Sequence, residues 1–212
     1  MILDKEELKA RLIPAMTDLA CRRKVREYAK NIERGSIVEV GAWMGACTSY
    51  AAMGLIDGKK NTKIDIHVYD QFKATRSEVE KAEGYALCLY KGEHTKYAFR
   101  NFMNPWWNRV NIITHIGSIA NSSWIRKPIG LYLDDASKRK VNFSHAMRIF
   151  KPYFIPGKTY LFMMDYFYFE KRDDPEYLTQ KEYFKKHKDE FQFVERISED
   201  ASLAIFLFKG KK

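Results

Sequence analysis

The segment Ser36–Gly45, SIVEVGAWMG, constrains the fold of this chain more than any other stretch of the sequence. The β-branched run Ile37–Val40 is typical of a short strand buried on both faces of a parallel sheet. Gly41 and Gly45 then allow a tight turn in which the backbone can approach a ligand closely, and the following helix start offers free N–H groups. Ordinary strand–helix junctions also favour glycine, so the turn alone does not establish a ligand site.

Strand-like and helix-like segments alternate along the rest of the chain. The strand patterns lie at Ile37–Val40, Ile64–Tyr69, Val110–Ile116, Ile129–Leu133, Thr159–Met164, Phe191–Ile197 and Ser202–Phe208. Helical patterns lie at Thr48–Leu55, Ser77–Leu89, His94–Met103, Lys140–Lys151 and Pro175–Lys188. The alternation predicts an α/β fold with a Rossmann-like, seven-stranded, mainly parallel sheet and helices on both faces. The short turn Ser198–Asp200 leaves no room for a helix, so the last two strands should form an antiparallel hairpin.

The first part of the chain reads as helical, with Pro14 separating two helices and Gly35 ending the second. We therefore expect residues 1–34 to be helices that either cover the ligand site or form a homodimer contact, and residues 35–212 to be the ligand-binding domain. No apolar stretch approaches the roughly 18–20 residues that a membrane helix needs. A soluble, cytoplasmic protein without a membrane partner is expected, with Cys21, Cys47 and Cys88 as free thiols.

The net charge of +10 favours anionic partners in a general way. Nucleic acid is one candidate, and phosphorylated or carboxylated small molecules or glycans are others. The basic residues are dispersed, however, and no nucleic-acid-binding module surrounds them, so a solvated basic surface is the simpler interpretation. One cluster, Lys138-Arg139-Lys140, directly follows a pair of acids at a predicted strand end, where an anionic ligand could meet it.

Acidic residues stand in or at the ends of the first two predicted strands. Ligands of open α/β sheets bind at the carboxyl ends of the strands, so these residues are candidates for a binding site. A carboxylate at Glu39, inside a buried strand, is costly without a donor, and a ligand ammonium group would satisfy it. Asp70 suits the two hydroxyls of a ribose, with Phe72 as an apolar wall for a base. Alternatively, Asp70 caps the helix that follows it.

Three later strand ends also carry candidate site residues. Gly117 and Ser118 can admit the edge of an adenine through backbone contacts. The acids Asp134-Asp135 and Asp165 can hold a hard cation or act as general base for a substrate hydroxyl, and the alternative is that they cap helices or are solvated. Among the histidines, His115 is the one near this edge and is a further candidate for a general base.

With these residues considered together, residues 30–208 resemble a class I S-adenosylmethionine-dependent methyltransferase. The sequence VEVGAWMG is similar to the first motif of that superfamily, Glu-x-Gly-x-x-x-Gly, which implies that the loop Gly41–Gly45 cradles the methionine part of the cofactor. The resemblance also implies that Asp70 holds the ribose hydroxyls and that Gly117-Ser118 lines the adenine. The full set of expected cofactor-binding residues is Glu39, Gly41, Ala42, Trp43, Met44, Gly45, Thr48, Asp70, Gln71, Phe72, Gly117, Ser118 and Asp134.

Within the superfamily, the sequence most resembles the branch of macrocin-type sugar O-methyltransferases and cephalosporin-hydroxylase-like proteins. The segments VYDQF, LYLDD and MMDY carry this resemblance. It implies a magnesium ion held by aspartates, for which Asp134 and Asp165 are the matching positions. Ala136 stands where a second acid is expected, and Met164 replaces the first acid of the branch's Asp-Asp-Tyr. These departures predict at most weak dependence on magnesium.

The leading hypothesis from the sequence is therefore an enzyme that transfers a methyl group from S-adenosylmethionine to an oxygen of a sugar or related small polar acceptor. Asp134 is the expected base or metal ligand, with Asp165 beside it. One alternative keeps the cofactor but takes RNA as acceptor, because of the positive charge. Another is a cofactor-binding protein without turnover, because of the altered acidic motifs.

Overall fold

Short apolar segments of the chain pair into one sheet in the computed structural model, which describes residues 4–171, 175–197 and 202–211. The strands are β1 (Ser36–Val40), β2 (Ile66–Asp70), β3 (Ile112–Ile116), β4 (Ile129–Asp134), β5 (Tyr160–Met163), β6 (Phe191–Ile197) and β7 (Leu203–Phe208). Their order in the sheet is β3-β2-β1-β4-β5-β7-β6. The first five of these are parallel, and β7 is antiparallel to both β5 and β6. The predicted mainly parallel sheet with a C-terminal antiparallel pair is confirmed.

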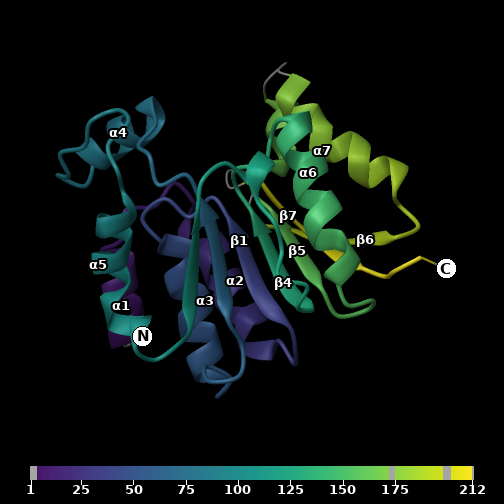
Figure 1. Ribbon diagram of the computed structural model, residues 1–212, viewed down its shortest axis with the longest axis horizontal. Coiled ribbons are helices and arrows are strands. Elements are labelled where there is room, and N and C mark those ends of the chain that lie inside the picture. The colour runs from purple at the N-terminus through teal and green to yellow at the C-terminus, as the bar shows by residue number, and fades with distance from the viewer. Residues whose placement is uncertain (1–3, 172–174, 198–201, 212) are drawn as a thin grey trace.

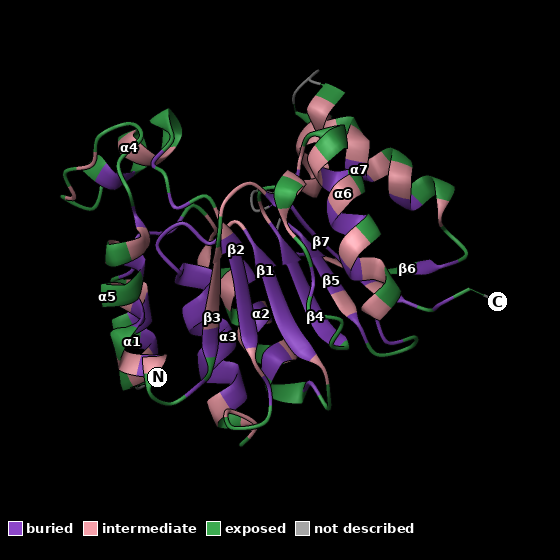
Figure 2. Ribbon diagram, in the orientation of Figure 1, coloured by how far each residue is buried: buried purple, intermediate pink, exposed green. Residues whose placement is uncertain are grey.

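Helices cover both faces of the sheet (Figure 1). The α-helices are α1 (Lys5–Arg11), α2 (Leu19–Asn31), α3 (Ala46–Asp57), α4 (Arg76–Glu83), α5 (Lys96–Trp107), α6 (Lys140–Phe150) and α7 (Pro175–Lys186). Short 3₁₀ turns are η1 (Ile119–Asn121), η2 (Lys151–Tyr153) and η3 (Tyr166–Glu170). Side chains of α2, α3 and α5 share one hydrophobic core with one face of the sheet, and those of α6 and α7 share a second core with the other face. The strands β1, β2, β4, β5 and β7 are almost entirely buried, whereas the edge strands β3 and β6 are partly exposed (Figure 2).

Alternation along the strands decides which core each side chain enters. In β1, Ile37 belongs to the core beneath α3, whereas Val38 and Val40 belong to the core beneath α6. In β4, Leu133 belongs to the α3 core and Tyr132 to the α6 core. Successive side chains of a strand point to opposite faces, so two adjacent residues at a strand end also point to opposite sides of the sheet.

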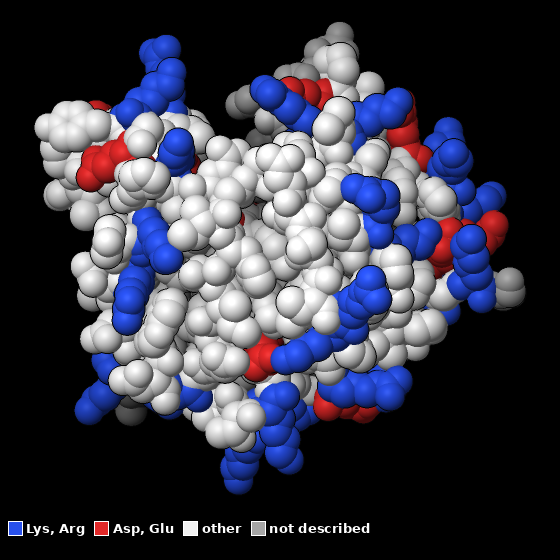
Figure 3. Space-filling view, in the orientation of Figure 1, with Lys and Arg blue, Asp and Glu red and all other residues white. Residues whose placement is uncertain are grey.

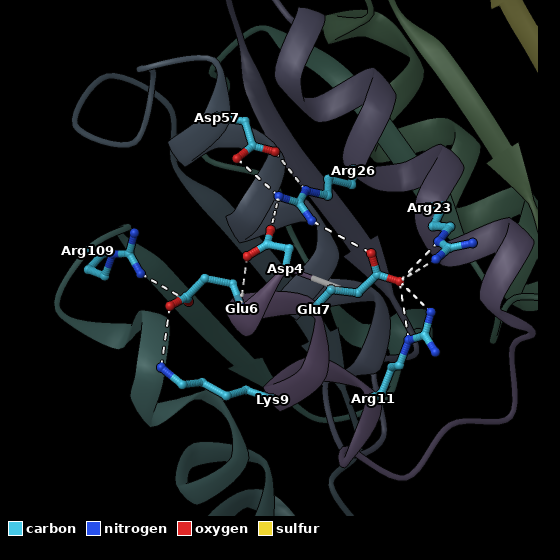
Figure 4. A network of polar contacts seen from close by, with 9 residues as sticks. All are labelled: Asp4, Glu6, Glu7, Lys9, Arg11, Arg23, Arg26, Asp57 and Arg109. Carbon is cyan, nitrogen blue, oxygen red and sulfur yellow. Dashed lines mark hydrogen bonds and ion pairs between the residues drawn. The ribbon is translucent and has the colours of Figure 1, made fainter. Parts of the chain in front are cut away.

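A network of ion pairs fixes the N-terminal helix to the rest of the fold (Figure 4). Arg26 of α2 donates to Asp4 at 2.7 Å and to Asp57 at the end of α3 at 2.6 Å. Glu7, which is 8% exposed, pairs with Arg11 at 2.9 Å and Arg23 at 2.8 Å. The segment after α1 is therefore anchored at its start, and it contains Pro14 between the two helices, as expected.

Three helix bounds in particular differ from the sequence prediction. Helix α2 ends at Asn31, with Ile32 at its C-cap, and not at Gly35. The helix expected over Ser77–Leu89 ends at Glu83, with Gly84 at its C-cap, and it begins with a capping box formed by Thr75 and Glu78. Helix α5 extends beyond Met103 through Pro105 to Trp107, because the fully buried Trp106 packs its last turn into the α3 core. The predicted turn Ser198–Asp200 lies outside the described residues.

Two further expectations concern the cysteines and membranes. Cys21, Cys47 and Cys88 are free. Across the described ranges, the structure contains no helix with the length and apolar character that a membrane crossing requires.

Helix α3 lies unusually close to α2 at Gly54, which gives a test of this packing. A Cβ on Gly54 would lie 2.4 Å from the Arg26 carbonyl oxygen and 2.7 Å from the Ala29 Cβ. We expect Gly54→Ala to lower the free energy of unfolding by about 1–3 kcal/mol, although alanine is the better helix former. Gly84→Ala is the control, because its Cβ would meet only an ordinary contact at 3.4 Å. Urea denaturation of both variants measures the difference, and equal stability would contradict the packing.

Candidate functional site

Three adjoining cavities lie at the carboxyl ends of the parallel strands. Their volumes are about 30, 180 and 590 Å³, and Met16 and Asp135 line all three. They are bordered by the loops after β1, β2, β4 and β5 and by the segment between α1 and α2. Helices α4 and α7 stand over opposite sides of this edge in Figure 1, and a hollow separates the two shoulders at the top of the space-filling view in Figure 3. We call the three spaces the β1, adenosine-side and outer cavities, in the order of the volumes given.

The loop after β1 can form only with glycine at two positions. Gly41 and Gly45 have φ angles of +86° and +90°, in the left-handed region. A Cβ on Gly41 would lie 2.7 Å from the Ala136 Cβ, and one on Gly45 would lie 2.9 Å from the Phe99 ring. The loop is therefore held tightly between the loop after β4 and helix α5. Of its residues, Gly41, Ala42 and Trp43 line the β1 cavity.

Asp70 connects this glycine loop to the end of β2. Its Oδ2 accepts hydrogen bonds from the backbone N–H groups of Ala42 at 2.7 Å and Trp43 at 2.9 Å. Its Oδ1 accepts from the backbone N–H of Phe72 at 2.6 Å. The side chain is partly exposed and lines the adenosine-side cavity together with Gln71 and Gly117. Three of the roughly four lone-pair sites of the carboxylate are thus occupied, and Oδ1 has one site left to accept from a ligand hydroxyl.

Glu39 is a buried carboxylate at the floor of the β1 cavity. It is 2% exposed, and among the described residues only the Thr48 hydroxyl of α3 donates to it, at 2.5 Å. Burial raises the pKa of Glu39 to about 8, against the opposing effect of the Thr48 hydrogen bond. A cationic group in this cavity would therefore find a carboxylate with capacity for another donor. The Trp43 Nε1 is likewise buried without a partner in the described structure, and Trp43 lines the same cavity.

Other residues expected to contact the cofactor lie away from the cavities. Met44 and Phe72 are fully buried in the α3 core, where Phe72 packs edge-on against Phe99 at 5.3 Å. Gly45 is behind the loop, against α5. The Ser118 hydroxyl caps η1 by accepting from the Ala120 N–H at 3.3 Å. None of the four is among the described residues that line the three cavities, so their expected contacts with a cofactor stay predictions without structural support.

The acids after β4 point in different directions. Asp134 is fully buried and accepts from the Tyr132 hydroxyl at 2.8 Å, the Ser137 N–H at 2.9 Å and the Ser137 hydroxyl. It is absent from the described lining of the cavities, whereas Asp135 lines all three. The alternation of β4 explains the difference, because Asp134 shares the face of Tyr132. The structure therefore offers Asp135 as the carboxylate that faces the cavities.

Asp165, at the end of β5, lines the outer cavity near Asp135. Lys138 lies between these two acids, with its Nζ 3.4 Å from both Asp135 Oδ1 and Asp165 Oδ2, and it also donates to the Met164 carbonyl. Burial acts to lower the pKa of Lys138, but the neighbouring carboxylates outweigh it and the pKa is raised. The lysine is therefore charged.

The residues at this edge do not fit a magnesium ion. Magnesium takes near-octahedral oxygen ligands at about 2.0–2.1 Å. The side chain of Asp134 is directed to Ser137 and Tyr132, Ala136 has no ligand atom in its side chain, and an ammonium group lies between Asp135 and Asp165. No group of three or more His, Cys, Asp or Glu suited to a metal occurs among the described residues.

His115 is not brought to these carboxylates. Its Nε2 lies 3.0 Å from the His67 Nδ1, and its ring stacks on Tyr69 at 4.1 Å. Burial lowers the pKa of His115. It is not among the described residues that line the cavities, so its expected role as general base gains no support from the geometry.

Several cavity residues carry no signal that sequence reasoning used. Met16 and Thr17 come from the segment between α1 and α2, far from any strand end in the sequence. Asn142 of α6 lines the adenosine-side cavity, and Tyr168 and Tyr177 line the outer one. Of this last pair, Tyr168 belongs to the aromatic run Tyr166–Phe169, whereas no pattern in the sequence marks Tyr177.

Comparison with solved structures places the fold of this chain among those of methyltransferases. The O-methyltransferase NovP superposes with a TM-score of 0.68 at 13% identity, covering 98% of this chain and 89% of that chain. CalS11, a TDP-rhamnose 3′-O-methyltransferase of calicheamicin biosynthesis, gives 0.60 at 14% identity, covering 90% and 77%. Cofactor-bound Rv0187 from MTB gives 0.60 at 12% identity, covering 97% and 88%. The chain has a methyltransferase fold.

The likeness is one of structure rather than sequence. No protein-family model matches the chain, and no curated protein matches its sequence. The methyltransferase fold explains why strands β1, β2, β4 and β5 end at one edge, beside the glycine loop.

The raised pKa of Glu39 predicts an unusual pH dependence of stability. Because the pKa rises from 4.5 in the unfolded chain to about 8 in the folded protein, stability is lost as the pH increases through this window. Glu39→Gln removes the ionisation, so we expect the unfolding midpoint of the variant to move upward relative to wild type between about pH 5 and pH 8, by several degrees. Thermal unfolding at these pH values measures the shift. A difference that does not change with pH would show that Glu39 is charged in the folded protein.

Proposed function

We propose that this protein is an S-adenosylmethionine-dependent O-methyltransferase that acts on a sugar or related small polyhydroxylated acceptor. One observation carries the proposal. A glycine loop, two acids suited to the cofactor and two acids suited to an acceptor lie together at one edge of a methyltransferase fold. The resemblance of the sequence to the macrocin-type branch and the fold shared with CalS11 support a sugar as the acceptor.

The β1 and adenosine-side cavities suit the two ends of the cofactor. Glu39 would pair with the ammonium of the methionine part, whose charge favours the ionised carboxylate. Asp70 would accept from a ribose hydroxyl while it keeps the glycine loop in place. The backbone at Gly117, beside Ile119 of η1, borders the space left for a base. When bound, S-adenosylmethionine supplies an electrophilic methyl group on a positively charged sulfur.

The outer cavity suits the acceptor. Its described lining contains four carboxylates and two tyrosines, and neither Lys nor Arg: Asp18, Glu78, Asp135, Asp165, Tyr168 and Tyr177. The rings of Tyr168 and Tyr177 meet edge-on at 5.4 Å and offer faces and hydroxyls to a sugar. A lining of this kind disfavours a phosphate at the reacting part of the acceptor. On the face drawn in Figure 3, Lys and Arg are scattered rather than gathered into one patch, so RNA is a poorer candidate.

The reaction requires an acceptor oxygen to lose a proton as it gains a methyl group. Asp135 and Asp165 border the outer cavity, and either carboxylate can accept the hydroxyl proton while the oxygen lone pair forms the new carbon–oxygen bond. The electron pair of the broken carbon–sulfur bond stays on sulfur. The remaining work of the chain is to align the two reactants and exclude water, to which Met16, Thr17 and the α1–α2 segment contribute by covering the cavities.

The free thiols favour a cytoplasmic location.

Binding of S-adenosylmethionine tests the cofactor half of the proposal. We expect Asp70→Ala to weaken binding about tenfold or more, because hydrogen bonds to a charged group are lost and the glycine loop is released. Asp65→Ala is the matched control, since Asp65 precedes the same strand at the opposite edge and bonds to Asn111 and Lys127. Isothermal titration calorimetry measures both affinities, and circular dichroism checks that each variant is folded.

The proposal fails if the wild-type protein shows no binding at high cofactor concentration. It also fails in its assignment of the site if Asp70→Ala, shown to be folded, binds as tightly as Asp65→Ala.

A further inference from the structure

We propose that Lys138 takes the place of a divalent metal at the acceptor site, so that its ammonium group positions Asp135 and Asp165 and methyl transfer needs no metal ion. The inference rests on the proposed function for its catalytic meaning. The structural part of the inference, in which Lys138 joins two carboxylates, depends only on contacts within the chain.

The ammonium group of Lys138 lies close to three oxygens of the protein. Its Nζ lies 3.4 Å from Asp135 Oδ1 and 3.4 Å from Asp165 Oδ2, and it donates to the Met164 carbonyl oxygen. The lysine side chain is 14% exposed, whereas those of Asp135 and Asp165 are 33% and 31% exposed. The two carboxylates therefore face the outer cavity, and the cation that holds them lies behind.

The sheet fixes both loops that Lys138 joins. The Met164 N–H donates to the Asp134 carbonyl at 3.0 Å, which continues the pairing of β4 with β5 beyond the last strand residues. The Asp135 N–H donates to the Val40 carbonyl at 2.9 Å, and Asp165 has a φ of 58°. Both carboxylates are thus placed by backbone constraints, and Lys138, just before α6, reaches the space between them.

A divalent cation cannot share this arrangement. It would have to enter beside an ammonium group already 3.4 Å from one oxygen of each acid, where the like charges repel. Ala136 provides no carboxylate and Asp134 is directed to Ser137 and Tyr132, so a cation admitted in place of the ammonium group would have only Asp135 and Asp165 as carboxylate ligands, with water for the rest. Lys138 instead compensates one of the two negative charges, so the pair stays together at the cavity wall without a metal.

The role of Lys138 is therefore positional. It does not line the described cavities itself, so it touches neither reactant, but it keeps two carboxylate oxygens directed toward the acceptor. The neighbouring Arg139 has a different task, since its Nε donates to Glu176 of α7 at 2.8 Å. The two adjacent basic residues thus provide a test variant and a matched control.

Manganese binding tests this inference without any acceptor. The probe is Mn²⁺ alone, followed by electron paramagnetic resonance of the free ion, with wild type, Lys138→Ala, Lys138→Arg and Arg139→Ala. We expect no binding at about 1 mM Mn²⁺ by wild type, Lys138→Arg or Arg139→Ala, and a new site in Lys138→Ala that binds at least about tenfold more tightly. Adding Asp165→Asn to Lys138→Ala should abolish the new site.

Two results would overturn the inference. One is Mn²⁺ binding by the wild type that is lost in Asp165→Asn, because the metal would then bind at these acids while Lys138 is present. The other is a folded Lys138→Ala, or Lys138→Gln if the alanine variant does not fold, that gains no Mn²⁺ site. Titration of the same samples with S-adenosylmethionine separates the two proposals. If the wild type does not bind the cofactor, the proposed function is refuted and the Mn²⁺ result still stands.

Discussion

The carboxylate of Asp70 accepts hydrogen bonds from three backbone N–H groups, and the candidate site depends on this arrangement. The bonds tie the loop after β1 to the loop after β2, so that Gly41 lies against Ala136 and the β1 cavity keeps its shape. Through Ala136, the same loop sets the position of Asp135. One side chain at the end of one strand thus links the space suited to a cofactor with the wall suited to an acceptor.

Charge is distributed at this edge in a way that the total of +10 does not indicate. Glu39, Asp70, Asp135 and Asp165 all face cavities, and Lys138, the basic residue nearest to the last two, is turned inward between them. The site is therefore acidic within a basic protein. Such a site favours a cationic cofactor group and an uncharged acceptor.

The sequence predicted the sheet well because its strands are short apolar runs separated by clear turns. It also predicted that Glu39, Gly41 and Asp70 lie at one edge of the sheet, since the carboxyl ends of parallel strands lie there. It favoured Asp134 over Asp135 as the site carboxylate, although Asp135 is the one that faces the cavities, because the choice depends on which face of β4 each side chain takes. From the sequence, Lys138 was interpreted only as part of the basic cluster Lys138-Arg139-Lys140. Its contact with Asp165 could not be predicted, because that contact depends on the pairing of β4 with β5. Met16 was missed because the packing of α1 and α2, not a motif, carries it to the site.

On the proposed function, the buried carboxylate of Glu39 receives the ammonium group of S-adenosylmethionine. The most direct measurement is the proton exchange that accompanies cofactor binding, from calorimetric titrations at pH 7 in buffers of different ionisation enthalpy. With a pKa of about 8, Glu39 is mostly protonated before binding, so we expect the release of close to one proton per cofactor bound. Binding without proton release, or equal release by Glu39→Gln, would contradict it.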